Sequence, residues 1–400
     1  MMEISFLPVF FHAIFNSVPY FFRYRHGRAF RWVILMHIVA PGAKTFANMA
    51  RFAPSHIMEW HFRRLINAAY WSAKIMMWKL SDHAIATLPQ PADRTAYFLA
   101  DGSVKEKRGK KSPMNQKGKK SKNSYYFFGL KFVVVMLQWD VYRIPLDFEI
   151  VKPKTDPDYE NENALFRKMF ARFTPPSWAC RIIVIGDCAY ASKANMKAII
   201  KRNKADKNCD WYFVFAIAKT WNMANGKNLK NLATYTPRSC FKQTWISHLT
   251  NPNRRKTFWI FRKKARLDHI GDVTIIMSKK GRNFGPKRIK MLVTNLPDVS
   301  AGTVLCIYQR RWQVEILFKE LKSGLGLGQQ QVTGKPERIE KAFALGIMAY
   351  LTLIIAQNKD IKSGKPWSIF QLKYNFMFRV MKGQVEHDTK LRLEKLDNNN

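Results

Sequence analysis

The stretch YYFFGLKFVVVMLQWDVYRIPLDFEIVK (125–152) decides the fold class, because its aromatic and β-branched residues predict two long strands that fold back near Trp139 and Asp140. Just upstream, AYFLADGS (96–103) has the pattern of a short buried strand, which we expect to end at Asp101. The sequence therefore predicts a sheet that begins with three consecutive strands.

Helices and strands alternate after this hairpin. Residues 160–173 and 193–203 carry apolar side chains at helical spacing, whereas CRIIVIGDCAY (180–190) and WYFVFAIAK (211–219) have the pattern of short apolar strands. Three strands followed by helix, strand, helix and strand is an α/β order. It predicts a mixed sheet of five strands with helices packed on it.

Further segments surround this core. Residues 220–300 hold short alternating stretches separated by Gly, Asn and Pro, and VLCIYQRRWQVEILFKELKSG (304–324) predicts a helix that stops at Gly324. A further helix is expected from about Pro336 to Asn358. We divide the chain into a helical N-terminal region (1–92), the first part of the core (93–219), a β-rich insertion (220–300), the final part of the core (301–360) and a polar C-terminal tail (361–400) that we expect to fray.

The N-terminal region allows two interpretations. Residues 44–71 predict two helices separated near Pro54, with Ser55 capping the second. Such a pair is either a helix-turn-helix that docks in a DNA groove or an ordinary helical pair that packs its own core. The sequence favours neither, so DNA binding by this region is one of two hypotheses.

The charge of the chain points to a polyanionic partner. Lys and Arg number 68 against 28 Asp and Glu, which gives a formal charge of +40 and a pI near 10.2. A compact fold with this imbalance repels itself unless a polyanion is present, and nucleic acid is the commonest one. A hydrophobic content of 47% excludes a disordered chain.

Cysteine usage and the apolar segments exclude other classes. The five cysteines form no C-x-x-C pair, which argues against a disulfide framework or a zinc knuckle and favours a reducing, intracellular setting. The apolar stretch 1–22 contains Pro8, His12, Asn16 and Pro19 and fits neither a signal peptide nor a membrane span. We therefore expect no membrane partner.

Two acidic residues stand where strands end. Asp101 and Asp187 each follow an apolar run and are each followed by small residues. Carboxylates at the ends of buried strands of one sheet can converge on a hard cation, although a lone Asp near a loop is more often a turn or cap residue.

The helix at 304–324 adds a polar stripe. Tyr308, Arg311, Glu315 and Lys322 lie at offsets of 0, 3, 7 and 14 and at about 100° per residue fall within a stripe roughly 60° wide. Apolar residues flank the stripe on both sides, which predicts that it is set into the protein body, whereas Glu320 faces elsewhere.

These residues carry a resemblance to a known family. The run Y-x-x-R-x-x-x-E-x-x-x-x-x-x-K from Tyr308 to Lys322 resembles the YREK signature of the large prokaryotic insertion-sequence group of DDE transposases. Asp187-Cys188-Ala189-Tyr190 is similar to the group's motif around its second Asp, and FLADGS places Asp101 where the first belongs. The resemblance covers roughly residues 93–360, and Gly102 departs from it where a second acidic residue is often found.

The resemblance implies a fold, an activity and a site. The fold is a ribonuclease H-like core with a β insertion before its final helix. The activity is metal-dependent cleavage and strand transfer at the ends of an insertion sequence. Asp101, Asp187 and Glu315 would be both the catalytic residues and the ligands of two Mg²⁺ ions, for which Mn²⁺ can substitute. The partners would be double-stranded DNA at transposon ends and target DNA, with a homodimer in the DNA complex and a cytoplasmic, nucleoid-associated location.

Cationic and aromatic side chains extend the predicted site. Arg311 and Lys322 would grip phosphate oxygens, and Tyr308 would bind a phosphate or stack on a base. A basic loop after Asp101 is either a clamp on the DNA backbone, which we favour, or a charged hairpin tip. Its candidate phosphate-binding residues, with one more at the end of the last core strand, are Lys105, Lys107, Arg108, Lys110, Lys111 and Lys219.

Trp245 and Trp259 in the insertion are candidates for stacking on an unpaired base, as happens in the wider class. A buried Trp in a small β core is the more common role for either residue.

Two alternatives remain open from the sequence. The first is a tyrosine-recombinase-like enzyme with Tyr308 as the nucleophile, which would need no carboxylate triad. The second is a catalytically inactive DNA-binding protein derived from a transposase.

Overall fold

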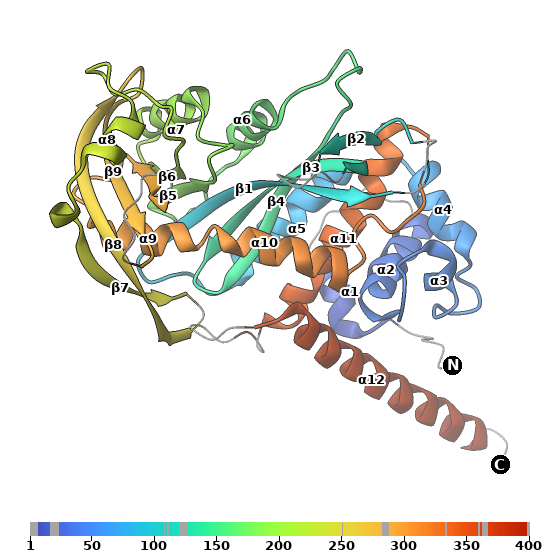
Figure 1. The fold of residues 1–400 in the computed structure, drawn as a ribbon. Coiled ribbons are helices and arrows are strands. Elements are labelled where there is room, and N and C mark those ends of the chain that lie inside the picture. The colour runs from blue at the N-terminus through green and yellow to red at the C-terminus, as the bar shows by residue number, and fades with distance from the viewer. Residues whose placement is uncertain are drawn as a thin grey trace.

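A mixed β-sheet runs through the whole molecule, and helices pack on both of its faces (Figure 1). The structure is a computed structural model that describes residues 7–16, 24–107, 109, 112–119, 126–249, 251–281, 288–332, 334–358, 361 and 367–397.

The strands at the centre have the predicted order. β1 (Thr95–Glu106), β3 (Tyr126–Trp139) and β4 (Tyr142–Val151) are antiparallel neighbours, with the chain reversing at Asp140. β5 (Arg181–Gly186) and β6 (Asp210–Ala216) then run parallel to β1. The spatial order β4–β3–β1–β5–β6 is consistent with a ribonuclease H-like core, as predicted.

The β-rich insertion continues this sheet. β10 (Lys290–Thr294) pairs antiparallel with the free edge of β6, and β9 (Gly271–Lys279), β8 (Asn251–Leu267) and β7 (Lys242–His248) follow outward. With β2 (Gln116–Lys119), which pairs with β3, the sheet has ten strands, so the five expected strands are its centre. An unpaired strand edge exposes hydrogen-bonding groups, and pairing with β10 satisfies those of β6. Two short elements precede β7, α8 (Leu229–Tyr235) and the 3₁₀ turn Arg238–Cys240.

Aromatic side chains fix one layer of helices on each face of the central strands. On one face, Phe98 of β1 packs against Phe166 of α6 (Glu162–Arg172), with α7 (Lys193–Ala205) beside it against β6. On the other face, Phe132 of β3 packs against Phe318 and Phe343 of two C-terminal helices. Side chains alternate along a strand, so Asp101 and Ser103 share the face of Phe132, whereas Gly102 faces α6.

The predicted helix 304–324 is divided in three. α9 (Ala301–Gln309) and α10 (Trp312–Lys319) are separated by a turn at Arg310 and Arg311, and a π-helical turn (η3, Glu320–Gly324) closes the segment. The helical spacing of the sequence places Tyr308, Arg311, Glu315 and Lys322 on one continuous helix. Because the segment is interrupted, their predicted alignment along one helical face holds only approximately.

The N-terminal helices pack on the core. They are α1 (Val9–Asn16), α2 (Tyr24–Val39), α3 (Phe46–Ala50), α4 (Glu59–Asn67) and α5 (Ala73–Thr87), of which α1, α2, α4 and α5 contact α11 (Pro336–Ala356). The two predicted helices are α3 and α4, but the expected capping role of Ser55 is wrong. The N-cap of α4 is Met58, because Ser55 lies in the turn before it.

One helix in the described ranges, α11, is long and apolar enough to cross a membrane, and 83% of its apolar window is buried inside the protein. It packs between the N-terminal helices and β4, and its bounds agree with the helix expected from about Pro336 to Asn358.

The C-terminal segment differs from its prediction. Residues expected to fray form α12 (Ile369–Asp397), a 29-residue helix whose outer half projects from the body (Figure 1). Its first turns are held because Ile369, Leu372, Phe376 and Val380 are buried among α1, α2, α11 and η3.

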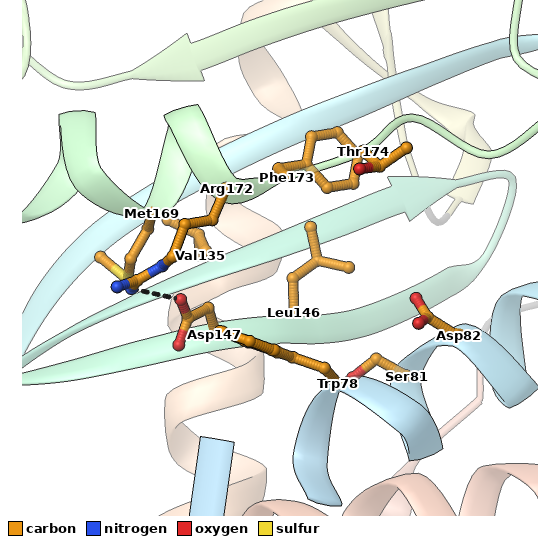
Figure 2. Close-up of a pocket in the computed structure, with 10 residues that line it drawn as sticks. All are labelled: Trp78, Ser81, Asp82, Val135, Leu146, Asp147, Met169, Arg172, Phe173 and Thr174. Atoms are coloured by element: carbon orange, nitrogen blue, oxygen red, sulfur yellow. Dashed lines mark hydrogen bonds and ion pairs between the residues drawn. The ribbon is translucent and has the colours of Figure 1, made fainter. Parts of the chain in front are cut away.

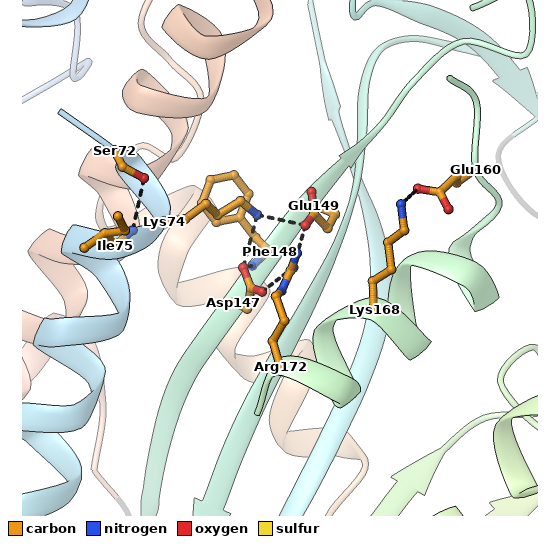
Figure 3. A network of polar contacts seen from close by, with 9 residues as sticks. All are labelled: Ser72, Lys74, Ile75, Asp147, Phe148, Glu149, Glu160, Lys168 and Arg172. Atoms are coloured by element: carbon orange, nitrogen blue, oxygen red, sulfur yellow. Dashed lines mark hydrogen bonds and ion pairs between the residues drawn. The ribbon is translucent and has the colours of Figure 1, made fainter. Parts of the chain in front are cut away.

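Charged side chains tie α5 and α6 to the sheet (Figure 3). Lys74 of α5 lies 3.1 Å from Asp147 and 3.3 Å from Glu149, both on β4. Arg172 of α6 reaches the same two carboxylates at 2.6 Å each. The two carboxylates thus have two cationic partners, which makes this a compensated structural network.

A buried ion pair holds the end of the segment formed by α9, α10 and η3. Arg143 of β4 donates to Glu320 at 2.9 and 3.1 Å, and both side chains are almost fully buried. Glu320 also accepts from the backbone N–H of Ile369 at 3.2 Å, so β4, η3 and α12 meet at this carboxylate. Glu320 thus faces away from Glu315, as the helical wheel predicts.

We predict that Arg143→Met lowers the free energy of unfolding by about 3–5 kcal/mol, because it leaves Glu320 as a buried charge without its partner. Denaturant titration would measure the loss. The double variant Arg143→Met/Glu320→Met is the control and should recover most of it. Equal losses in the two proteins would contradict this account.

Candidate active site

The parallel pairing of β1 and β5 places two carboxylates side by side. Thr95 to Leu99 pair in register with Arg181 to Ile185, an offset of 86 residues. The same offset carried two residues further aligns Asp101 with Asp187, on adjacent strands that lie about 4.8 Å apart. The two predicted acidic residues therefore lie next to each other.

Each Asp is held by its local backbone. Asp187 directly follows β5 and accepts a hydrogen bond from the Ala189 N–H at 2.8 Å, which shapes the turn after the strand. Asp101 accepts from the Gly102 N–H at 2.8 Å. The prediction that Asp101 ends its strand is wrong, because pairing with β3 carries β1 on to Glu106.

Arg311 connects the third acidic residue to the first. Its guanidinium donates to Glu315 Oε1 at 2.5 Å and lies 3.7 Å from Asp101 Oδ2. Glu315 is on α10, which packs on β1, so this helix faces the sheet surface that carries Asp101. Asp101 thus lies beside Asp187 on the sheet and is linked through Arg311 to Glu315.

Like charges strain this cluster. Burial, together with the neighbouring Asp187 and Glu315, raises the pKa of Asp101 to about 7, against the opposing effects of the Gly102 N–H and Arg311. A group of carboxylates with too little positive charge is the donor set that a hard divalent cation fits. Within the described part of the chain, no three His, Cys, Asp or Glu side chains are already drawn together as a metal cluster, and the Arg311 guanidinium lies between Asp101 and Glu315 instead.

The other members of the stripe lie against the same surface. Lys322 donates to Ser103 Oγ at 2.7 Å and to the Val104 carbonyl at 2.6 Å, two and three residues past Asp101. Tyr308 is buried, and Lys290 of β10 lies 4.4 Å from its ring centre. Burial raises the pKa of Tyr308 to about 12, which disfavours the phenolate that a tyrosine nucleophile needs.

The structure distributes the predicted phosphate-binding lysines over separate places. Lys107 donates to the carbonyls of Gly328 and Gln330, and burial lowers its pKa to about 8. Lys105 and Lys107 line one cavity of about 340 Å³. Lys219 lies elsewhere, beyond β6, where its backbone carbonyl accepts a hydrogen bond from the Lys230 N–H. Arg108, Lys110 and Lys111 lie outside the described residues.

A cavity of about 730 Å³ lies beside the cluster, between the insertion and the segment α9–α10. Tyr308, Arg311 and Trp312 line it from the helices, and Phe258 and Lys290 line it from the insertion. Sequence analysis missed Phe258 and Trp312. The available signal for Trp312 was its position directly after Arg311 in the sequence. On the helical wheel, Trp312 counts only as one of the apolar residues beside the polar stripe.

The two predicted stacking residues lie on neighbouring strands. Trp245 of β7 is 65% exposed, whereas Trp259 of β8 is half-buried and packs against the core. Neither residue is among those that line the 730 Å³ cavity.

A smaller cavity, of about 160 Å³, lies between α5, β4 and α6 (Figure 2). Trp78, Leu146 and Phe173 form its walls, and the Arg172–Asp147 ion pair crosses one side. It shares no residue with the carboxylate cluster and is a gap in the packing beside the network of Figure 3.

We predict that Asp187→Asn raises the free energy of unfolding at pH 8 in chelator by about 1 kcal/mol, because it removes one like charge from beside Asp101. The folded pKa of Asp101, about 7, exceeds its ordinary value of 3.8, so the folded state binds an extra proton between these values. Stability is therefore lost as pH rises through this window, and the whole penalty is present above pH 7.

Thermal and denaturant unfolding at pH 5 and pH 8 would show the effect, because the free energy of unfolding should change less between these two pH values in the variant than in the wild type. Asp268→Asn, at an exposed carboxylate paired with Lys193, is the control and should leave the dependence unchanged. An unchanged slope in Asp187→Asn would rule out the electrostatic coupling.

Comparisons with known proteins agree with this geometry. No curated protein matches the chain. Among solved structures, the chain is similar to the piggyBac transposase synaptic complex with hairpin DNA, at 10% identity and a TM-score of 0.51, over 92% of this chain and 73% of that one. At this identity the likeness shows the fold alone. The NurA nuclease from Sulfolobus solfataricus matches at 9% identity over 58% of this chain and 78% of that one, and its TM-score of 0.26 supports no conclusion.

The family model described as the transposase DDE domain matches residues 98–352. This span contains Asp101, Asp187 and Glu315, the central strands and the insertion, and it is more than half of the 400 residues. The chain therefore belongs to the DDE transposase family.

Proposed function

We propose that this transposase cuts DNA at the ends of an insertion sequence and joins those ends to target DNA, as a member of the prokaryotic YREK-signature group. The observation that supports this most is the position of Asp101, which has Asp187 beside it at the end of the adjacent parallel strand and Glu315 across from it on the facing helix, linked through Arg311. DDE transposases generally use divalent metals.

The three carboxylates are the proposed ligands of two Mg²⁺ ions, or of Mn²⁺, which when bound would activate the attacking water or 3′-hydroxyl and stabilise the leaving oxygen. In this proposal Asp101 and Asp187 provide ligands from the adjacent strands β1 and β5, and Glu315 provides ligands from the facing helix α10. The raised pKa of Asp101 supports this role, because a bound cation would stabilise the charged carboxylate that burial and the neighbouring Asp187 disfavour.

The cationic residues have separate proposed roles. Arg311, which neutralises Glu315 and faces Asp101, is suited to hold a nonbridging phosphate oxygen once the carboxylates have cationic partners of their own. Lys322, tied to Ser103 and Val104, adds fixed positive charge beside β1, and Lys105, Lys107 and Lys219 remain candidates for contacts with the DNA backbone. Tyr308 remains a candidate for phosphate or base contact from the cavity wall.

Double-stranded DNA is the proposed partner. The formal charge of +40 favours the phosphate backbone, and the 730 Å³ cavity combines aromatic rings with Lys256, Lys280 and Lys290 beside the carboxylates. The similar piggyBac structure is a synaptic complex with hairpin DNA. We extend this to a homodimer that pairs two transposon ends, acting in the cytoplasm at the nucleoid.

Catalysis by the triad, rather than DNA binding alone, is open to a direct test. Asp101→Asn, Asp187→Asn and Glu315→Gln should each lower the rate of Mg²⁺-dependent end cleavage by about 10³-fold or more. DNA binding, measured by fluorescence anisotropy, should stay within a few-fold. Asp298→Asn, at an exposed carboxylate paired with Lys264, is the matched control and should cleave normally.

Near-normal cleavage by any of the three variants would remove that residue from the catalytic set. A wild-type protein that binds DNA but does not cleave or join it with Mg²⁺ or Mn²⁺ would support the inactive DNA-binding alternative. A covalent protein–DNA adduct formed without metal would support Tyr308 as a nucleophile.

From the lining of the 730 Å³ cavity we predict which aromatic side chain contacts a base near the cut site. Trp312, 58% exposed and next to Arg311, should stack on a terminal base, so Trp312→Ala should weaken binding of a precut DNA end by roughly 5-fold or more. Trp245→Ala, at an equally exposed indole outside the cavity, tests the earlier candidate. The fluorescence of 2-aminopurine at the terminal position would report stacking, and a loss in Trp245→Ala alone would place the base on the insertion.

A further inference from the structure

Glu162 covers the backbone of the residue that follows Asp101. A Cβ atom built on Gly102 would overlap Glu162 Oε2 and would lie 3.7 Å from the Tyr190 hydroxyl. Since Gly102 faces α6, its missing side chain leaves the space that the Glu162 carboxylate fills. Glu162 is the first residue of α6, after the N-cap Asn161.

A chain of amide contacts fixes this helix end to the turn that carries Asp187. Asn163 Nδ2 donates to the Ala189 carbonyl at 3.0 Å. Asn195 Nδ2 donates both to Asn163 Oδ1 at 2.6 Å and to the Tyr190 carbonyl at 2.9 Å. These contacts fix the position of Glu162 relative to both β1 and β5. Its carboxylate lies over Gly102 on β1 and beside the turn that follows β5.

Tyr190 lies between Glu162 and the catalytic carboxylates. Glu162, Asp101 and Asp187 all act on its hydroxyl, and together with burial they raise the pKa of Tyr190. The side chain is only 2% exposed, and its hydroxyl lies close enough to the Glu162 carboxylate to interact with it as a donor, although the geometry falls short of a regular hydrogen bond. A water molecule between the hydroxyl and the carboxylates would satisfy this buried polar group.

The salt bridge from Lys131 to Glu162 does not explain this arrangement. Lys131 of β3 contacts Glu162 Oε1, and the two side chains are 33% and 29% exposed. Ion pairs at this exposure contribute little to stability. The bridge occupies one carboxylate oxygen and leaves Oε2 directed at the space over Gly102.

We propose that Glu162 is a fourth acidic residue of the active site, a positioning residue that, with the Tyr190 hydroxyl, binds water ligands of the cation held by Asp101 and Asp187. The proposal rests on the proposed function, since it assumes that these carboxylates bind a divalent ion. Mg²⁺ and Mn²⁺ keep several waters in protein sites, and partners of those ligands commonly change metal affinity 10- to 100-fold.

Binding of Mn²⁺ to the full-length protein, followed by electron paramagnetic resonance, tests the proposal without relying on activity. Glu162→Gln should weaken Mn²⁺ binding by about 10-fold or more. Glu160→Gln is the matched control, because Glu160 lies two residues earlier, is 32% exposed and is paired with Lys168. A merely structural ion pair would make the two variants behave alike.

A carboxylate swap separates this role from effects on folding. Gly102→Asp combined with Glu162→Ala moves the acidic group from α6 to β1, into the space that Glu162 leaves, and should restore Mn²⁺ binding relative to Glu162→Ala alone. Tyr190→Phe keeps the packing of the ring on Phe166, 5.7 Å between centroids, and should also weaken binding.

The outcomes separate the two proposals. If Asp101→Asn abolishes Mn²⁺ binding while Glu162→Gln binds as wild type and the swap changes nothing, Glu162 has no role at the site and the proposed function stands. If the wild type binds no Mn²⁺ at all, the metal centre fails, and the role of Glu162 fails with it.

Discussion

The register between β1 and β5 is the constraint on which the site depends. A parallel pair with an offset of 86 residues aligns Asp101 with Asp187, and a slip of one residue would turn one of the two carboxylates to the opposite face. The buried apolar residues of the two strands resist such a slip, because it would turn the side chains of the shifted strand to the opposite face of the sheet. The residues concerned are Phe98 and Leu99 on β1 or Ile183 and Val184 on β5. The packing of the core thus sets the distance between Asp101 and Asp187, the two carboxylates proposed to be catalytic.

Burial alone does not distinguish structural from catalytic carboxylates in this protein, whereas compensation by cations does. Asp147 has Lys74 and Arg172 within 3.1 Å, and Glu320 has Arg143 in direct contact. Asp101 has Arg311 at 3.7 Å, too far for a hydrogen bond, and two carboxylates nearby. Asp147 and Glu320 hold helices to the sheet, whereas the carboxylate of Asp101 lacks a cationic partner at hydrogen-bonding distance, as the proposed metal-binding role requires.

Much of the fold could be predicted from the sequence because its signals are local. The strand runs around Trp139, the apolar strand before Asp187 and the helical spacing of Tyr308 to Lys322 each follow from the side chains of one segment. What escaped prediction depends on contacts distant in sequence. The continuation of β1 past Asp101 needs β3, the folding of residues 369–397 needs α2 and α11, and the approach of Glu162 to Gly102 needs a missing side chain 60 residues away.

The antiparallel seam between β6 and β10 joins the insertion to the catalytic strands in one hydrogen-bonded lattice. A domain attached by a linker can rotate about it, but a strand inside a sheet can only twist together with its neighbours. Any substrate bound by the outer strands β7 and β8 would therefore keep its orientation toward the proposed active site. Rearrangement between successive reaction steps would then have to come from the nucleic acid itself or from the helices, with the sheet as the rigid reference.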